Sequence, residues 1–183
     1  IPDIPINISG YIPKNYSGDY WGAVTADQAL VNSLNSPFVY LLKEFGVAKF
    51  CDFLKKIGLS GIIYDADHYG LSLILGGAEA SLFDVTNVYG KMAKLLYLHQ
   101  NGLETKEDKK YYKFFSPSSI MITFKTLLNL NRPYEQIGWQ YFTSTKNVAW
   151  KTGTSFGNKD AWSIGVIDRY VVGVWVGNAN GEG

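Results

Sequence analysis

The fold is decided by the stretch Val148-Ala149-Trp150-Lys151-Thr152-Gly153-Thr154-Ser155-Phe156-Gly157. Valine and tryptophan at its start favour an extended strand, and the small residues after the lysine indicate a turn. Lys151 places a positive charge beside two threonine hydroxyls, and Gly153 allows another backbone to come close. This combination suits an anionic or acyl-transfer substrate that lies along the edge of the strand. The alternative is an ordinary edge-strand lysine that protects the strand from aggregation.

Apolar residues alternate with a period of two in the last quarter of the chain, whereas the first three quarters have helical spacing. The alternation predicts three strands, near residues 147–155, 161–167 and 170–177. Short turns at Gly157-Asn158 and Asp168-Arg169 should join them. Helices followed by a strand meander indicate an α+β fold. Because the sequence contains no repeat or linker, we expect residues 1–183 to form a single domain.

Capping residues mark the expected helix ends. Thr25 and Gln28 have the spacing of a capping box, and this helix should stop near Ser33-Leu34-Asn35. Ser36-Pro37 should start the next helix, with serine as the cap and proline in the first turn. Ser116-Pro117 repeats that pattern and predicts another helix, which should stop before Pro133.

The remaining segments divide into two helices and three less regular regions. Helices are expected over Val47 to Ile57 and from Ser81 to Gly102. Residues 1–23 contain several prolines and glycines and should be irregular, and the glycine-rich residues 59–78 should be rich in loops. The charged run from Glu104 to Lys113 is expected to be a solvated loop or hairpin.

The composition argues against several classes of function. A net charge of +1 gives no reason to expect a nucleic-acid partner. The single Cys51 rules out an internal disulfide and a multi-cysteine metal site, so we expect a buried thiol. His68 and His99 lack the spacing of metal ligands, and we expect neither a metal nor a cofactor. No apolar run is long enough to span a bilayer.

A second candidate motif, Ser33-Leu34-Asn35, lies at the break between two expected helices. In such a corner a hydroxyl and an amide two residues apart can point into one cleft, where Ser33 would relay a proton and Asn35 would hold a carbonyl. A lysine close to Ser33 would ease proton movement through that hydroxyl. The alternative is structural, because serine and asparagine are common at helix ends.

Taken together, these motifs resemble two of the three motifs of the penicillin-recognising serine enzymes: Ser-x-Asn and, far downstream, Lys-Thr-Gly-Thr. Ala29 to Pro37 resembles the second-motif segment of bifunctional (class A) penicillin-binding proteins. Gly76 to Leu82 resembles the start of their next long helix. Trp150 before the motif lysine, with Asp160-Ala161-Trp162 after it, is similar to the 1C branch. The resemblance covers essentially all 183 residues.

This resemblance implies a DD-transpeptidase domain that cross-links peptidoglycan stem peptides and is acylated by β-lactams. Its fold would be the α+β serine-transpeptidase type, an antiparallel sheet flanked by helices. Ser33 would shuttle the proton, Asn35 would hold the acyl-side amide, and Lys151 would supply a positive field. Thr152 and Thr154 would bind the substrate carboxylate, and the backbone N–H of Thr154 would be one oxyanion donor. The expected substrate-binding residues are therefore Thr152, Gly153 and Thr154.

One departure from the family pattern concerns the nucleophile. The family carries it in a Ser-x-x-Lys motif several tens of residues before Ser-x-Asn, and only 32 residues precede Ser33 here. No serine has a lysine three positions later; the nearest approach is Thr143-Ser144-Thr145-Lys146. We therefore expect a fragment truncated on its N-terminal side, which forms no penicilloyl adduct by itself. The start on Ile1 rather than methionine agrees with this expectation.

The resemblance also implies partners and a location. The parent protein would act on stem peptides, bind β-lactam antibiotics and contain the missing N-terminal part. It would be anchored in the inner membrane by a segment outside this chain and face the periplasm within the cell envelope. A truncated sheet would leave an unpaired edge, so we expect low stability or association through the exposed surface.

Two other functions remain open from the residues. Gly153-Thr154-Ser155-Phe156-Gly157 matches the Gly-x-Ser-x-Gly elbow of α/β-hydrolases, with Ser155 as nucleophile. That elbow must pass from strand to helix and be followed by an acid and a histidine, whereas the pattern returns to strand and no histidine follows. The other alternative is a non-catalytic module that binds peptidoglycan or glycan through its aromatic surface.

Overall fold

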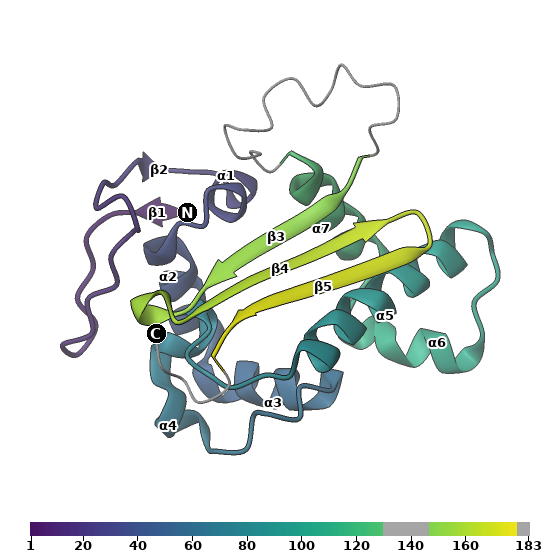
Figure 1. Cartoon of the computed structure of the whole chain (residues 1–183), viewed down its shortest axis with the longest axis horizontal. Helices are drawn as coiled ribbons and strands as arrows, with labels where there is room; N and C mark the ends of the chain where they lie inside the picture. Colours follow the sequence, from purple (N-terminus) through teal and green to yellow (C-terminus); the bar gives the residue numbers. More distant parts are fainter. Residues whose placement is uncertain (130–146, 179–183) are drawn as a thin grey trace. The chain divides into compact units, whose positions relative to one another are not determined.

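The computed structural model describes residues 1–129 and 147–178 as helices and antiparallel strands (Figure 1). Contacts divide the chain into two compact units, Ile1–Val85 and Thr86–Gly183. The expectation of a single domain stays a prediction. The stretch 143–146 lies outside the described residues. The helix that was expected to stop before Pro133 ends at Leu128, as predicted.

The first unit begins with a short antiparallel pair, β1 (Pro2–Asp3) with β2 (Gly22–Ala23). Three helices follow, α1 (Ala26–Val31), α2 (Asn35–Phe45) and α3 (Val47–Ile57). The capping box of Thr25 and Gln28 is present at α1, as predicted. The segment 59–78, which was expected to be rich in loops, contains two short helices, α4 (Ala66–Tyr69) and the 3-10 helix η1 (Gly70–Leu75).

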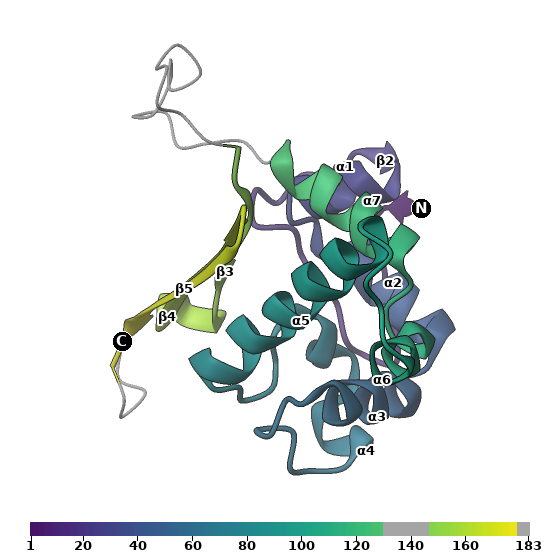
Figure 2. The same cartoon turned by 90° about the vertical axis from the view of Figure 1, so that its right-hand side faces the viewer.

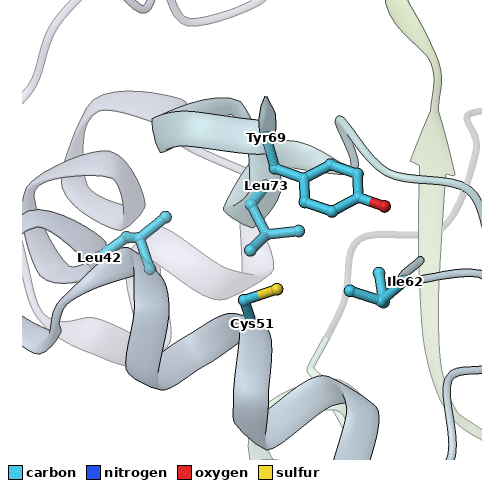
Figure 3. Packing of buried hydrophobic residues seen from close by; sticks show 5 residues of the cluster. All are labelled: Leu42, Cys51, Ile62, Tyr69 and Leu73. Carbon is cyan, nitrogen blue, oxygen red and sulfur yellow. The ribbon is translucent and has the colours of Figure 1, made fainter. Parts of the chain in front are cut away.

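Two apolar clusters hold the helices of this unit together. The larger consists of Leu42, Cys51, Ile62, Tyr69 and Leu73, which join α2, α3, α4 and η1 (Figure 3). Cys51 is a buried thiol, as predicted. The smaller cluster consists of Val24, Ala29 and Leu34 and fixes the junction between α1 and α2.

The second unit contains most of α5 (Leu82–Gln100), then α6 (Lys106–Lys110), the 3-10 helix η2 (Tyr111–Lys113) and α7 (Pro117–Leu128). Ser116 caps α7 with proline in its first turn, as predicted. The expectation of a loop or hairpin over residues 104–113 was wrong, because Thr105 and Asp108 form a capping box that starts α6. No helix among residues 1–129 and 147–178 combines the length and apolarity that a membrane span requires.

The sheet of the second unit is a meander of β3 (Ala149–Thr154), β4 (Asp160–Ile167) and β5 (Tyr170–Gly177), in that order. Lys151 pairs with Ile164, which in turn pairs with Gly173. The face that carries the buried Ala149 and Ile164 lies toward the helices: α7 contacts β3, and Figure 2 shows α5 and α7 on one side of the sheet. The three predicted strands and both turns between them are confirmed.

Candidate functional site

Ser33 occupies the position after the end of α1 at which the chain reverses. Its N–H donates to Leu30 O at 3.3 Å, and the N–H of Leu34 donates to Ala29 O at 3.0 Å. These two bonds form a Schellman motif, whose turning residue adopts the left-handed conformation and is usually glycine. Here that residue is a serine, with φ 52° and an exposed side chain. The adjacent Leu34 is buried, so the exposed hydroxyl stands on an anchored corner.

Asn35 begins α2 and is tied twice to the N-terminal segment. Its backbone N–H donates to Asn15 Oδ1 at 2.8 Å, and its side-chain Nδ2 donates to Lys14 O at 2.7 Å. The expectation that Ser36 caps this helix was wrong. The cap position is Leu34, and Ser36 is fully buried with a hydroxyl that makes no hydrogen bond within the described residues.

Lys151 lies in β3 on the helix-facing side of the sheet, across from buried Ile164. Its ammonium donates to Thr152 O at 2.7 Å. Burial lowers the pKa of Lys151 below the ordinary value of 10.5 because an ammonium is poorly solvated there. A partly desolvated positive charge of this kind acts more strongly on a neighbouring group than a fully hydrated one does.

The outer edge of β3 presents backbone groups to a ligand. Ser155 N–H donates to Asp160 O at 3.0 Å, which continues the β3–β4 register by one pair. Because backbone groups alternate in direction along a strand, the N–H and C=O of Thr154 and Thr152 point away from β4. In the part of the chain that the structure describes, no strand pairs with this edge. The side chains of Thr152 and Thr154 are exposed, so both hydroxyls are accessible.

Gly153 is not required by the packing of its own sheet. A Cβ built at this position would lie 3.8 Å from the Cβ of Trp162, which is ordinary van der Waals contact. The glycine therefore leaves space above an exposed strand, where a ligand or another backbone can approach.

Ser155 lies in the hairpin between β3 and β4 rather than in a nucleophile elbow. A three-residue 3-10 turn, η5 (Phe156–Asn158), follows it and leads directly into β4. The hydroxyl of Ser155 accepts a hydrogen bond from the backbone N–H of Asp160 at 2.8 Å and so supports this turn. An elbow needs a strand that passes into a helix, and this geometry does not supply one.

The structure thus brings the predicted residues together in two groups. Ser33 and Asn35 form a corner of the first unit, and Lys151, Thr152, Gly153 and Thr154 form a strand edge of the second. That the two groups act at one site stays a prediction. Sequence reasoning missed Asp3 and Asn15, which hold the corner, because they lie in an irregular segment with no periodicity or capping spacing.

Comparisons with known proteins show that this chain is similar to penicillin-binding proteins. Penicillin-binding protein 1C of Escherichia coli (strain K12) is 32% identical over 181 residues, which are 99% of this chain and 23% of the relative. The chain is homologous to class A penicillin-binding proteins. No family model matches it. The chain spans about a quarter of the length of the curated relatives it matches.

Solved structures of these proteins share the fold. Penicillin-binding protein 1A from Haemophilus influenzae superposes with a TM-score of 0.73 at 19% identity, over 99% of this chain and 34% of that one. PonA1 from Mycobacterium tuberculosis in complex with penicillin V gives a TM-score of 0.69 at 20% identity, over 98% of this chain and 54% of that one. The predicted α+β fold of penicillin-binding-protein transpeptidase domains is confirmed.

Proposed function

We propose that these 183 residues are part of a peptidoglycan DD-transpeptidase that cross-links stem peptides and is acylated by β-lactams. The observation that carries the proposal is the exposed hydroxyl of Ser33 in a left-handed conformation. For a residue with a side chain this conformation costs about 1–2 kcal/mol relative to the right-handed one. Such strain concentrates at functional sites, and here the neighbouring Leu34 and the two turn hydrogen bonds maintain it.

The corner of the first unit would handle the proton and the acyl side of the substrate. The Ser33 hydroxyl can accept and donate a proton, so it can pass one toward the leaving amine. The Asn35 amide has two N–H groups and one oxygen, and its bond to Lys14 O uses a single N–H. The remaining groups suit an amide of the stem peptide, to which they can donate and from which they can accept.

The strand edge of the second unit would handle charge. Lys151 would supply a positive field at Ser33, which favours loss of the hydroxyl proton. The hydroxyls of Thr152 and Thr154 would bind the terminal carboxylate of the peptide. The outward N–H of Thr154 would be one oxyanion donor, and loss of one such donor costs about 2.7–4 kcal/mol of transition-state stabilisation in other enzymes.

The acyl-forming serine would lie in a part of a longer protein outside these residues. This part of the proposal rests on the amino-acid sequence, in which no serine is followed by lysine three positions later. The remaining groups orient and stabilise, but none of them is a nucleophile with an adjacent base of the expected type. The chain by itself would therefore be inactive.

The proposed partners follow from this reaction. They are the stem peptides of peptidoglycan, β-lactam antibiotics and the nucleophile-bearing part of the same protein, with no nucleic acid involved. The protein would work in the cell envelope, on the periplasmic side of the inner membrane, anchored by a segment outside these residues.

Mass spectrometry after incubation with penicillin tests the proposal on two samples. We expect a stoichiometric adduct on the longer protein and none on the 183-residue chain, and we expect Lys151→Ala to slow formation of the first. An adduct on the short chain would refute the missing nucleophile. Peptidoglycan binding that survives Lys151→Ala, without any adduct on the longer protein, would instead support a non-catalytic binding module.

A further inference from the structure

We propose that Asn15, held by the buried carboxylate of Asp3, is a positioning residue for the Ser33-Leu34-Asn35 corner. The inference rests on the proposed function, because it assigns a task to residues behind the site. It concerns only contacts inside the first unit.

Asn15 replaces the missing local cap of α2. The first N–H groups of a helix have no partner within it, and the cap position here is a leucine without a side-chain acceptor. Asn15, 20 positions upstream, brings its Oδ1 to 2.8 Å from the N–H of Asn35 and 3.5 Å from that of Ser36. The next residue, Pro37, has no N–H to satisfy.

The other end of the Asn15 amide fixes its orientation. Nδ2 donates to Asp3 Oδ1 at 2.8 Å and Oδ2 at 3.1 Å, and also to Asp19 O at 2.9 Å. Exchanging the amide oxygen and nitrogen would place an acceptor against this carboxylate and donors against two N–H groups. The contacts therefore permit one orientation, which aims the oxygen at the corner.

The buried carboxylate of Asp3 holds Asn15 in this orientation. Its side chain is 0% exposed and accepts a third hydrogen bond, from the backbone N–H of Trp21 at 2.9 Å. A buried carboxylate that loses its donors becomes strongly unfavourable, so Asp3 holds Asn15 in place. Asp3 also belongs to β1, which pairs with β2 and so ties the group to the first unit.

Asn35 is the residue on which these contacts converge. Its backbone is held by Asn15, and its side chain is held by the carbonyl of the preceding Lys14. A displacement of the 14–15 segment would thus move both anchors of Asn35 together. Misplacement of a substrate-binding group by about 1 Å can cost about a hundredfold in rate.

The test uses paired substitutions in the longer protein, with the rate constant of penicillin acylation per folded molecule as readout. Asn15→Asp sets two carboxylates against each other, and we expect it to slow acylation by about tenfold to a hundredfold. The exchanged pair Asp3→Asn with Asn15→Asp restores a donor facing a carboxylate and keeps an acceptor toward Asn35, and among the contacts of Asn15 it gives up the donation to Asp19 O. We expect acylation within about threefold of wild type, since the corner contacts return.

Asn7→Ala is the matched control. Asn7 lies in the same N-terminal segment, and its Oδ1 also accepts a backbone N–H, but from Gly10 at 2.9 Å and not from the corner. We expect Asn7→Ala to leave the rate unchanged. A rate for Asn15→Asp equal to that of the control, or an exchanged pair that melts like wild type but stays slow, would overturn the inference.

Amide hydrogen exchange separates this inference from the proposed function. We expect the N–H groups of Asn35 and Ser36 to exchange faster in Asn15→Ala and to be protected again in the exchanged pair. If Asn15→Ala does not fold, the exchanged pair and Asp3→Asn still give this measurement. Absence of acylation in wild type would count against the proposed function alone, whereas unchanged exchange at both amides would refute the positioning role.

Discussion

At the residue scale, Ser33 combines a serine side chain with a backbone conformation that favours glycine. We expect Ser33→Gly to relieve the strain and Ser33→Ala to retain it. The free energy of unfolding of the glycine variant should therefore be about 0.5–1 kcal/mol higher than that of the alanine variant. Both should lose acylation activity in the longer protein, because both lack the hydroxyl.

Urea unfolding of the two variants checks this expectation. An alanine variant as stable as the glycine variant would show that the left-handed conformation at position 33 carries no strain. Such a result would remove the observation on which the proposed role of Ser33 depends.

Lys151 gives a second prediction at this scale, through pH. Folding lowers its pKa, so the unfolded chain binds the proton more tightly between the folded-state pKa and 10.5. The free energy of unfolding should therefore rise with pH across this window, relative to a Lys151→Met variant that has no such proton. Denaturant titrations of both proteins over the window measure the difference, and a difference that falls with pH would contradict the lowered pKa.

Strand β3, which contains Lys151, could be predicted from the sequence, whereas the left-handed conformation of Ser33 could not. Trp150 and the alternating pattern around it indicate β3, because strand periodicity is local in sequence. A left-handed serine has no local signal, since residue preference at that position points to glycine. The strain is maintained by the burial of Leu34, which is a tertiary effect.

At the element scale, the same contrast governs the helix ends. The starts of α1 and α7 were predictable because Thr25 and Ser116 cap them from the adjacent position. The start of α2 was misplaced because its cap, Asn15, comes from a distant segment. The capping box that starts α6 is also local in sequence, but the high density of charged residues around it favoured the prediction of a loop.

The junction between α5 and α6 contains a carboxylate with an acid-sensitive contribution to stability. Glu104 Oε1 accepts a hydrogen bond from the Tyr112 hydroxyl at 2.7 Å and lies 2.6 Å from His99 Nδ1. These contacts, the tyrosine first, lower the pKa of Glu104 below its ordinary 4.5. Burial and Glu104 raise the pKa of Tyr112 to about 12, so its hydroxyl remains a donor.

Because folding lowers the pKa of Glu104, this contribution is present above pH 4.5 and is lost as pH falls through the folded-state pKa. We expect Tyr112→Phe to return the pKa toward 4.5, as measured by NMR titration of the carboxyl group. Tyr111→Phe, which alters the exposed neighbouring tyrosine, is the control and should leave it unchanged. A Glu104 pKa that is equal in wild type and Tyr112→Phe would contradict the assignment.

At the scale of the whole molecule, the sheet carries an exposed apolar face. Val172, Val174 and Val176 of β5 are 54%, 49% and 65% exposed on the side away from buried Ile164. β5 is also an edge of the described sheet. An exposed apolar edge strand favours association, so we expect the isolated chain to self-associate.

Sedimentation velocity tests this expectation with a triple variant, Val172→Thr, Val174→Thr and Val176→Thr. Threonine keeps the branched shape and strand preference of valine while making the face polar, so association should decrease. Ile63→Thr, at an exposed site in the first unit, should change little. A wild-type chain that sediments as a single monomer and melts cooperatively would count against the prediction.

The central claim is that Ser33 and Lys151 act on the same substrate, although they lie in different units. A double-mutant cycle on penicillin acylation of the longer protein, with Ser33→Ala and Lys151→Ala, measures their coupling most directly. If the two residues acted independently, the rate losses of the two single variants would multiply. We predict that the double variant is acylated about tenfold or more faster than that, because either change already removes the shared proton route. A double variant in which the two losses multiply would show that the two residues act independently and would contradict the account.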